Sequence, residues 1–402
     1  MDIEAVTTEE GWQALEPGWD SLVERSASAT VFLTAEWLRP WWRHFRRPDE
    51  TLWILAAREG DSLVGLAPLC RGRVRAAGRL GSLRRVGFIG DHSGDSEYLD
   101  FLAAPGREGD VTRAFLDHIA ANAADWDLLE FLLLPKASPS YEAVRRFCAE
   151  RGYLADEREW ACLSIPLPGD WESYLKTLQP RFRSKLRSLE RRLPAGREAA
   201  YESCADAADL PSRLESLFDL HQRRWRAAGK PGAFADAARC GFYREMGEAF
   251  LRRGWLRFCS LQIEGRWAAH EFSFEHLGRV SFLQQAFDTG CAESNVGTAL
   301  KGHVIRESIE RGAREYDFLG GGAEYKGRWG AQERPCVSLV AARPGVRTRL
   351  HLWLPRFGAR VRDGGRALTP APLLRLKRRV QEQRRRRRFP PSEASEGEGR
   401  GQ

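Results

Sequence analysis

A short polar turn between a strand and a helix is the part of this sequence best suited to chemistry. The turn, Ser294-Asn295-Val296-Gly297-Thr298, follows the apolar segment Phe282 to Phe287 and precedes residues with helical periodicity. A helix that begins at such a turn presents unpaired backbone N–H groups and its positive dipole end at one point. The pattern therefore predicts a site for an anion, above all a pyrophosphate. A plain helix start is the alternative interpretation, because short glycine-containing turns are common.

The turn belongs to a predicted strand–helix–strand unit. Apolar residues at helical spacing form the inner side of the helix, which ends before Gly312, and the next strand is Tyr316 to Leu319. The apolar residues are Leu300, Val304, Ile305 and Ile309. Before the unit, three segments read as an antiparallel meander. They are Leu256 to Ile263, Trp267 to Phe274 and Val280 to Phe287.

The first half of the chain shows the same order of elements. Its predicted helices are Ala35 to Phe45, Val111 to Ala123 and Ser140 to Arg151. Its predicted strands are Leu52 to Ala57, Ser62 to Leu69, Arg85 to Ile89, Tyr98 to Leu102, Asp127 to Leu134 and Cys162 to Leu167. Further helices are predicted at Trp171 to Leu193, Leu210 to Ala228 and Ala235 to Arg253, and a last strand at Cys336 to Ala341. This order predicts a mixed α/β fold used twice, in domains 1–168 and 169–343.

Composition limits the class of protein. A chain of 402 residues with 43% hydrophobic content can bury a large core. It lacks an apolar run of about 20 residues, and its acidic N-terminus does not match a secretory signal, so we expect a cytoplasmic protein. The eight cysteines are scattered without a CxxC pair. We therefore expect reduced thiols and neither a disulfide framework nor a metal site.

The positive charge is concentrated in residues 343–402, which hold 17 Lys and Arg against five Asp and Glu. The rest of the chain has 46 and 50, so its body is slightly acidic and no specific nucleic acid is expected as a partner. Residues 344–402 are predicted to be a basic, largely disordered tail. The tail is either dispensable or a peripheral contact with the inner face of a membrane.

Five segments carry a resemblance to known proteins. They are Val31 to Leu38, Arg181 to Arg187, Leu220 to Trp225 with Gly229 and Phe234, Asn295 to Thr298, and Tyr316 to Gly321 with Tyr325 to Trp329. In order and spacing they resemble the GNAT acyltransferase superfamily. They are more closely similar to its double-domain branch with the CelD-like proteins of cellulose biosynthesis, and more distantly to Fem-type aminoacyl transferases. The resemblance covers Pro17 to Arg343.

The resemblance implies two tandem GNAT-like domains, each a mostly antiparallel mixed sheet flanked by helices. In such folds two neighbouring strands diverge and a thioester donor lies between them. The implied donor is acetyl-CoA or another acyl-CoA, held by Asn295, Val296, Gly297, Thr298 and Ala299. This turn has one glycine where the family's Q/RxxGxG/A pattern has two. Asn295 can adopt the left-handed backbone conformation that a glycine usually supplies.

Acyl transfer to an amine needs a base, stabilisation of the oxyanion and an acid for the leaving group. The resemblance assigns Lys326, in a YK-type motif, to donor phosphate or the oxyanion; an exposed loop lysine is the alternative. Glu271 is our candidate base, because only one of His270 and Glu271 can point into a crevice. Asp317 is a second candidate, or else a carboxylate that pairs with Lys326 or Arg328 for structural reasons.

Acceptor binding is assigned to His221, Tyr325 and Trp329. His221 lies on the apolar side of a predicted helix, where a core histidine is the alternative. The polar loop Asp91-His92-Ser93-Gly94-Asp95 could also carry function or be a solvated turn. Trp41 and Trp42 are expected to pack in a core.

The sequence thus predicts an acyltransferase that moves an acyl group from acyl-CoA to an amine or hydroxyl acceptor. A small molecule or a saccharide or cell-envelope precursor is the expected acceptor, suggested by family context alone. Fem-type aminoacyl transfer from charged tRNA is an alternative, although the long coiled-coil arm of many such proteins is absent from residues 171–253. A non-catalytic scaffold that docks at the membrane is a third.

Overall fold

The computed structural model describes residues 1–77, 81–196, 198–321 and 323–354. In the first half the described elements are β1 (Asp2–Val6), α1 (Glu9–Arg25), η1 (Val31–Leu33), α2 (Ala35–Phe45), β2 (Thr51–Leu52), β3 (Ile54–Glu59), β4 (Ser62–Ala67), β5 (Leu69–Arg75), β6 (Ser82–Phe88), β7 (Leu102–Ala103), α3 (Glu108–Ala121), η3 (Ala123–Asp125), β8 (Leu128–Pro135), α4 (Pro139–Glu150) and β9 (Leu154–Pro166).

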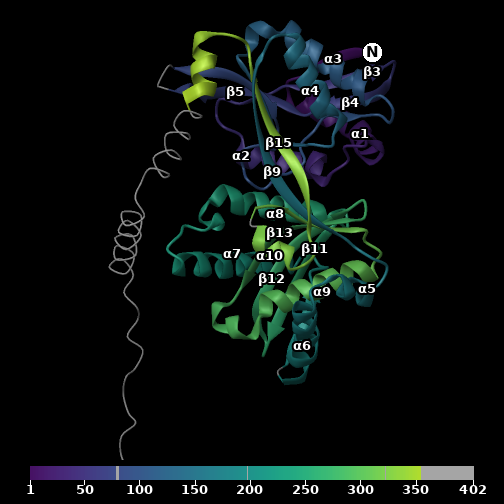
Figure 1. Ribbon diagram of the computed structural model, residues 1–402, viewed down its shortest axis with the longest axis vertical. Helices are drawn as coiled ribbons and strands as arrows, with labels where there is room; N and C mark the ends of the chain where they lie inside the picture. Colours follow the sequence, from purple (N-terminus) through teal and green to yellow (C-terminus); the bar gives the residue numbers. More distant parts are fainter. Residues whose placement is uncertain (78–80, 197, 322, 355–402) are drawn as a thin grey trace, which may run out of the picture.

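In the second half they are α5 (Trp171–Thr177), α6 (Pro180–Gly196), β10 (Ala199–Ser203), α7 (Leu210–Ala227), η4 (Ala233–Ala235), α8 (Ala237–Arg252), β11 (Leu256–Ile263), β12 (Arg266–His276), β13 (Arg279–Phe287), η5 (Thr289–Ser294), α9 (Val296–Glu310), β14 (Glu315–Gly320), α10 (Ala323–Gly327) and β15 (Gln332–Ala342). Both halves lie one above the other in Figure 1.

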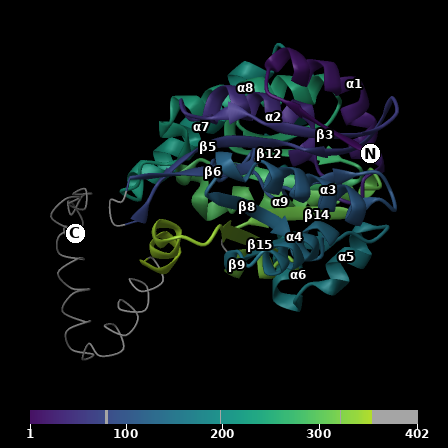
Figure 2. The ribbon, with the colours of Figure 1, turned by 90° about the horizontal axis from the view of Figure 1, so that it is seen from above.

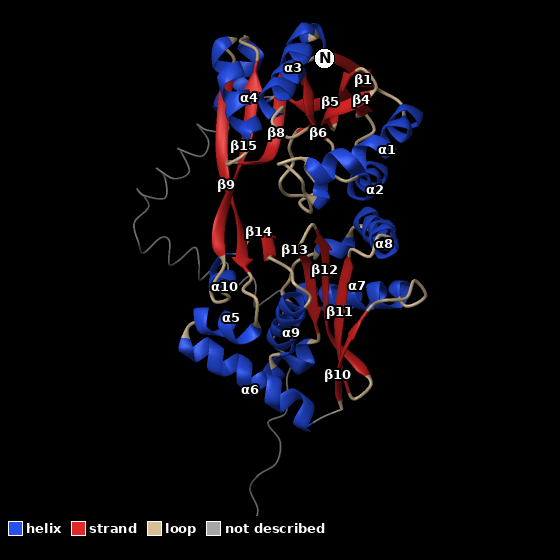
Figure 3. Cartoon of the chain, turned by 90° about the vertical axis from the view of Figure 1, so that its right-hand side faces the viewer, coloured by secondary structure: helices blue, strands red, loops and turns tan. Residues whose placement is uncertain are grey.

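Two long strands join the halves. Within the described residues, one sheet has 11 strands in the order β10-β11-β12-β13-β14-β9-β15-β8-β6-β5-β2, and a second has four in the order β1-β3-β4-β7. The end of β9 pairs with β14 in the second half, and the end of β15 pairs with β8 in the first. On their other edges β9 and β15 pair with each other, from Leu154 to Ser164 and from Gln332 to Ala342, and Figure 3 shows β9 running through both halves.

Each half contains one parallel strand pair connected through a helix, as the repeated order of elements predicted. In the first half β6 and β8 are parallel and α3 lies between them in sequence. In the second half β13 and β14 are parallel and α9 connects them. The tandem mixed α/β fold is therefore confirmed. The domain limits 1–168 and 169–343 stay a prediction.

The halves also share a core. Trp37 of α2 stacks edge-on against Phe242 of α8, with ring centroids 5.1 Å apart, and also contacts Phe274 of β12. Trp41 and Trp42 are buried beside it, as expected for core residues. In Figure 2 helices α1, α2, α7 and α8 lie along one side of the strands, and α4, α5 and α6 along the other.

Several predicted elements differ from the observed ones; the strands Leu52 to Ala57 and Ser62 to Leu69, for example, are each divided into two. The expected strand Tyr98 to Leu102 is mostly irregular, and β7 begins only at Leu102. The expected helix Trp171 to Leu193 is broken into α5 and α6, because the residue before Pro180 is disfavoured in the helical conformation. Strand β9 begins at Leu154, eight residues before the predicted start, since its exposed polar residues gave no apolar pattern.

Residues 346–354, inside the segment predicted as tail, are helical. Leu352 of this helix is buried in a small apolar cluster with Leu83 and Leu128. The rest of the predicted tail lies outside the described residues. All eight cysteines carry free thiols. Among the described residues, every helix is too short or too polar to cross a bilayer.

Candidate functional site between two diverging strands

The candidate site begins where β13 and β14 separate. They pair through Arg279–Ser281 and Glu315–Asp317 and then diverge. A pocket of about 790 Å³ opens there, lined from β13 by Phe282, Leu283, Gln284, Gln285 and Phe287, and from β14 by Phe318, Leu319 and Gly320. Leu319 has a φ of 57°, a left-handed conformation that costs energy in a non-glycine residue and is often found at functional sites.

Lys326 holds the diverging end of β14 in place. Its Nζ lies in the pocket wall and donates to the carbonyl oxygens of Phe318, Leu319 and Gly320, at 2.9, 2.9 and 2.6 Å. The side chain is 2% exposed, so the alternative of an exposed loop lysine is wrong. Burial lowers the pKa of Lys326 to about 8. Since its three protons have partners, Lys326 is placed to shape the site; a direct contact with donor phosphate or oxyanion stays a prediction.

A carboxylate from the first half reaches the same place. Glu97 lines the pocket, its Oε1 accepts from the amide of Gly320 at 3.1 Å, and its Oε2 accepts from the thiol of Cys162 at 3.4 Å. A Cβ on Gly320 would lie 2.2 Å from Glu97 Oε1, so this approach requires glycine. Burial raises the pKa of Glu97 to about 7, against opposing hydrogen bonds from Cys162, Trp160 and Gly320.

Sequence analysis missed Glu97. It comes two residues after the candidate polar loop Asp91 to Asp95 and directly before the predicted strand Tyr98 to Leu102, so it belongs to neither pattern. Asp95 also lines the pocket, and there it forms an ion pair of 2.5 Å with Arg239 of α8. The loop therefore joins the halves at the pocket.

Asp317 is a bridge between the halves. Its Oδ2 accepts from the hydroxyl of Tyr98 at 2.7 Å and its Oδ1 from the amide of Leu319 at 2.7 Å. Arg334 lies 3.8 Å away. The charge of Asp317 also acts on Lys326, where it opposes the lowering of the lysine's pKa, and the predicted pairing with Arg328 stays a prediction. Burial raises the pKa of Asp317. The carboxylate is fully buried and is not among the residues that line the pocket.

Glu271 lies behind the pocket wall in a buried cluster. Its Oε2 accepts from Lys301 Nζ at 2.9 Å and from Gln285 at 3.2 Å, and its Oε1 accepts from the hydroxyl of Tyr316. Lys301 also lies 3.3 Å from the ring centroid of Phe282, which lines the pocket. His270 is bonded instead to Ser260 and Ser216, so the two neighbours do face opposite sides.

Lys301 was not among the predicted site residues, although its position in an apolar helix indicates that it is buried. It follows Leu300 on a helix whose inner side is apolar, and a buried ammonium there must have a partner. Burial lowers the pKa of Lys301, while the charge of Glu271 acts in the opposite direction. With this partner in contact, Glu271 is part of an ion pair in addition to being a candidate base.

The predicted donor turn has the expected backbone. Asn295 has φ 53° and ψ 35°, a left-handed conformation, and its side chain does not cap α9. Its Oδ1 accepts from Lys185 of α6 at 2.7 Å. The amides of Thr298 and Ala299 donate to the Asn295 carbonyl, so the amides of Val296 and Gly297 are the better candidates for an anion. Gly297 packs closely against Phe287, since a Cβ there would lie 3.1 Å from the ring.

The three predicted acceptor residues lie in different surroundings. Tyr325 lines the pocket and is 43% exposed, and burial of its hydroxyl raises its pKa to about 12. Trp329 is buried against Phe182, with its carbonyl bonded to Tyr174 at 2.9 Å, and is a core residue. His221 is buried against Phe234 and is not a pocket residue, and burial lowers its pKa to about 4.

Comparison with known proteins agrees with this geometry. Residues 180–327 match the family model for an acetyltransferase (GNAT) domain. The chain thus contains a GNAT-family acyltransferase domain, and the matched range extends from α6 through the diverging strands to α10. No functionally curated protein matches the chain in sequence.

Two solved structures share this fold at low identity, and a third aligns more weakly. FemX superposes with a TM-score of 0.58 and 12% identity, covering 85% of this chain and 97% of that one. The C-terminal domain of a putative lysylphosphatidylglycerol synthetase from Agrobacterium fabrum gives 0.50 and 12%, covering 85% and 95%. A tandem GNAT protein from the clavulanic acid biosynthesis pathway gives 0.46 and 16%, covering 86% and 100%.

Proposed function

We propose that the protein transfers an acyl group from acyl-CoA to a primary amine in the pocket between β13 and β14. The observation that carries this proposal is the divergence of the two strands around a pocket of about 790 Å³, inside the matched GNAT domain. That volume suits a small-molecule site. Beyond Ser281 the backbone of β13 has lost its β14 partner and can bond an extended donor, as a sheet edge bonds an added strand.

The donor's pyrophosphate is proposed to lie at the start of α9. The amides of Val296 and Gly297 and the helix dipole favour an anion there. Lys185 reaches Asn295 from α6 and adds a positive charge at this point. Arg224 lines the pocket and lies over the rings of Trp225 and Phe287, a second cation for a negatively charged substrate group. We propose no metal in this step.

Glu97 is the base we propose for the reaction. It accepts one proton from the ammonium of the acceptor, and the free amine then attacks the thioester carbonyl carbon. A C–N bond forms and the C–S bond breaks; the departing thiolate takes the amine's second proton, and the proton on Glu97 returns to solvent. A carboxylate with a pKa of about 7 is suited to this role near neutral pH. Lys326 and Gly320 are positioning residues, because they fix the peptide that bonds Glu97.

Aminoacyl transfer from charged tRNA is the second candidate. The fold similarity to FemX and to the lysylphosphatidylglycerol synthetase domain favours it. So does α6, on which Arg181, Lys185 and Arg187 are exposed and from which Lys185 contacts Asn295 at the start of α9. An acceptor on a saccharide or cell-envelope precursor, in a CelD-like setting, and a cytoplasmic site of action remain part of the proposal. A non-catalytic scaffold that docks at the membrane stays a third hypothesis.

Calorimetric titration of the full chain tests the donor. The titration gives the Kd of acetyl-CoA, and acetyl-CoA at 100 times that Kd should raise the free energy of unfolding by about 2.7 kcal/mol. Lys185→Glu should weaken binding about tenfold, while Lys176→Glu, an exposed change on α5, should not. Mass spectrometry of glucosamine and other primary amines incubated with acetyl-CoA and enzyme then detects N-acylation. Binding and transfer only with aminoacyl-tRNA would establish the second candidate; no response to either donor would exclude both.

A further inference from the structure

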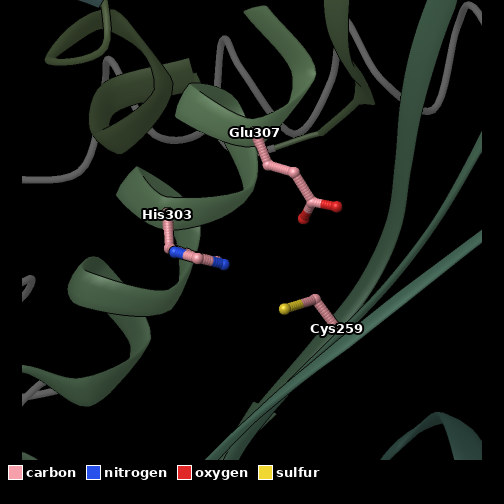
Figure 4. A group of neighbouring side chains, drawn as sticks. All are labelled: Cys259, His303 and Glu307. Atoms are coloured by element: carbon pink, nitrogen blue, oxygen red, sulfur yellow. The ribbon is translucent and has the colours of Figure 1, made fainter. Parts of the chain in front are cut away.

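Three potential metal ligands converge where α9 faces β11, outside the pocket between β13 and β14. They are Cys259 of β11 and His303 and Glu307 of α9, shown in Figure 4 with their side chains directed toward one another. One ligand atom from each residue lies within 4.8 Å of the other two. No metal-binding motif in the sequence indicates this site, because the cysteine and the histidine come from elements 44 residues apart in the chain.

The local structure explains why the three side chains meet. His303 and Glu307 are four residues apart on α9, so they lie on the same face of the helix, one turn apart. This face packs over β11, where Cys259 is buried at 3% exposure. The imidazole of His303 stacks on Tyr201 of β10, with ring centroids 4.0 Å apart and an angle of 5° between the planes. Stacking of this kind fixes the ring orientation, as supporting groups around metal ligands do.

The donor atoms indicate which ion the site would take. A thiolate sulfur, an imidazole nitrogen and a carboxylate oxygen are together the ligand types of zinc. Metal–ligand distances of about 2.0–2.3 Å place tetrahedral ligand atoms roughly 3.3–3.8 Å apart. Rotation of the Glu307 and Cys259 side chains, moving their ligand atoms by about an ångström, would therefore close the present arrangement around an ion.

A pocket supplies access and room for a fourth ligand. Cys259 and Glu307 line a cavity of about 260 Å³, together with Ser203 and Cys204. Glu307 Oε1 has a competing cation, since Arg311 lies 3.6 Å from it. Arg311 is also 3.5 Å from Glu275, so it keeps an ion-pair partner when Glu307 turns toward a metal.

We propose that Cys259, His303 and Glu307 bind one zinc ion, with water in the fourth position, and so fasten α9 to β11. The site is independent of the proposed acyl transfer. Its role is structural: it would tie the helix that begins at the donor turn to the strand beneath it. Because metal binding to a preformed site is coupled to folding, bound zinc would stabilise this half of the protein.

Titration of the metal-free, full-length chain with zinc chloride tests the site. One ion per chain should bind, and Cys259→Ser, His303→Gln and Glu307→Gln should each weaken binding at least tenfold. Cys240→Ser and His118→Gln, which change the same residue types elsewhere, should bind like the wild type. Cobalt should give a thiolate-to-metal charge-transfer band that Cys259→Ser removes.

If Cys259→Ser folds poorly, the melting temperature of Glu307→Gln with and without zinc provides the test. Glu307 is only partly buried, so Glu307→Gln should fold normally yet lose the rise in melting temperature that zinc gives the wild type. Equal zinc affinity in wild type and Glu307→Gln, or a cobalt spectrum without the sulfur band, would overturn the proposal. Weak binding of several zinc ions per chain, changed also in the control variants Cys240→Ser and His118→Gln, would overturn it as well.

Discussion

The amide of Gly320 donates a hydrogen bond of 3.1 Å to Glu97, a residue 223 positions earlier in the chain. The bond crosses from the diverging end of β14 to the segment that follows the polar loop of the first half. On the other side of the same residue, the carbonyl of Gly320 accepts from Lys326. A single peptide segment therefore connects the lysine of the second half with the carboxylate of the first, at the edge of the pocket.

Replacing Glu97 tests the proposed base. Glu97→Gln should lower kcat about 10²–10⁴-fold, the usual contribution of a general base. In the wild type, kcat/KM should rise with pH through about 7, where Glu97 loses its proton, and the variant should lack this limb. Glu248→Gln, an exposed change on α8, should keep the wild-type pH profile. A Glu97→Gln enzyme with the wild-type profile and rate would show that another group takes the proton.

The same group links stability to pH. The pKa of Glu97 is raised from 4.5 to about 7 in the fold, so between these values the folded protein binds more protons than the unfolded chain. The free energy of unfolding should therefore fall as pH rises from about 4.5 to 7 and then level off for this group. Glu97→Gln should reduce that fall, which urea titrations of both proteins at pH 5 and 8 can measure.

A pair of glycine substitutions tests the close contact at the pocket edge. Gly320→Ala places a Cβ 2.2 Å from both Glu97 Oε1 and Trp160 Nε1, so it should displace Glu97 and reduce kcat at least a hundredfold. Gly327→Ala, in α10, meets no atom within 4 Å and should leave kcat and KM unchanged. Comparable activity in the two variants would contradict the assigned geometry.

Removing the ammonium of Lys326 should disturb structure and turnover together. Lys326→Met leaves three carbonyl oxygens without their donor, at a cost of about 2–4 kcal/mol in the free energy of unfolding. Lys326→Arg should restore little, because a planar guanidinium cannot direct three N–H groups to carbonyls arranged around one nitrogen. Denaturant unfolding and steady-state kinetics measure the two effects. Full stability in Lys326→Met with lost turnover would instead assign the lysine a direct contact with substrate.

Tyr98→Phe tests the bridge between the halves. The variant removes the hydroxyl that donates to the buried carboxylate of Asp317, and it should cost about 1–3 kcal/mol of unfolding free energy. Tyr325→Phe alters a pocket residue that is 43% exposed and should leave stability within about 0.5 kcal/mol. Thermal unfolding of the two variants side by side provides the comparison.

The sequence was most informative where residues alternate or repeat along one element. The helix Ala35 to Phe45 and the strand Leu256 to Ile263 were predicted with the observed bounds, because their apolar residues have a clear period. The left-handed Asn295 could also be foreseen, since the turn needs a residue that tolerates this conformation.

The site could be predicted only in part, because its remaining members come together through long-range packing. Lys326 and Tyr325 lie in one motif and both reach the pocket. Glu97 has no local signal, since its raised pKa arises from burial against β9 and β14. Trp329 and His221 have the residue types of a binding site, yet their aromatic neighbours make them part of the core.

Because the halves exchange strands β9 and β15, the second half alone would lack strand partners that it has in the intact chain. A fragment that began after β9 would leave β14 with an open edge, and its own β15 would extend into solvent without β8. Uncovered edges of this kind recruit strands from other molecules. Such a fragment should therefore self-associate, and the enzyme is best dissected by point substitution in the intact polypeptide.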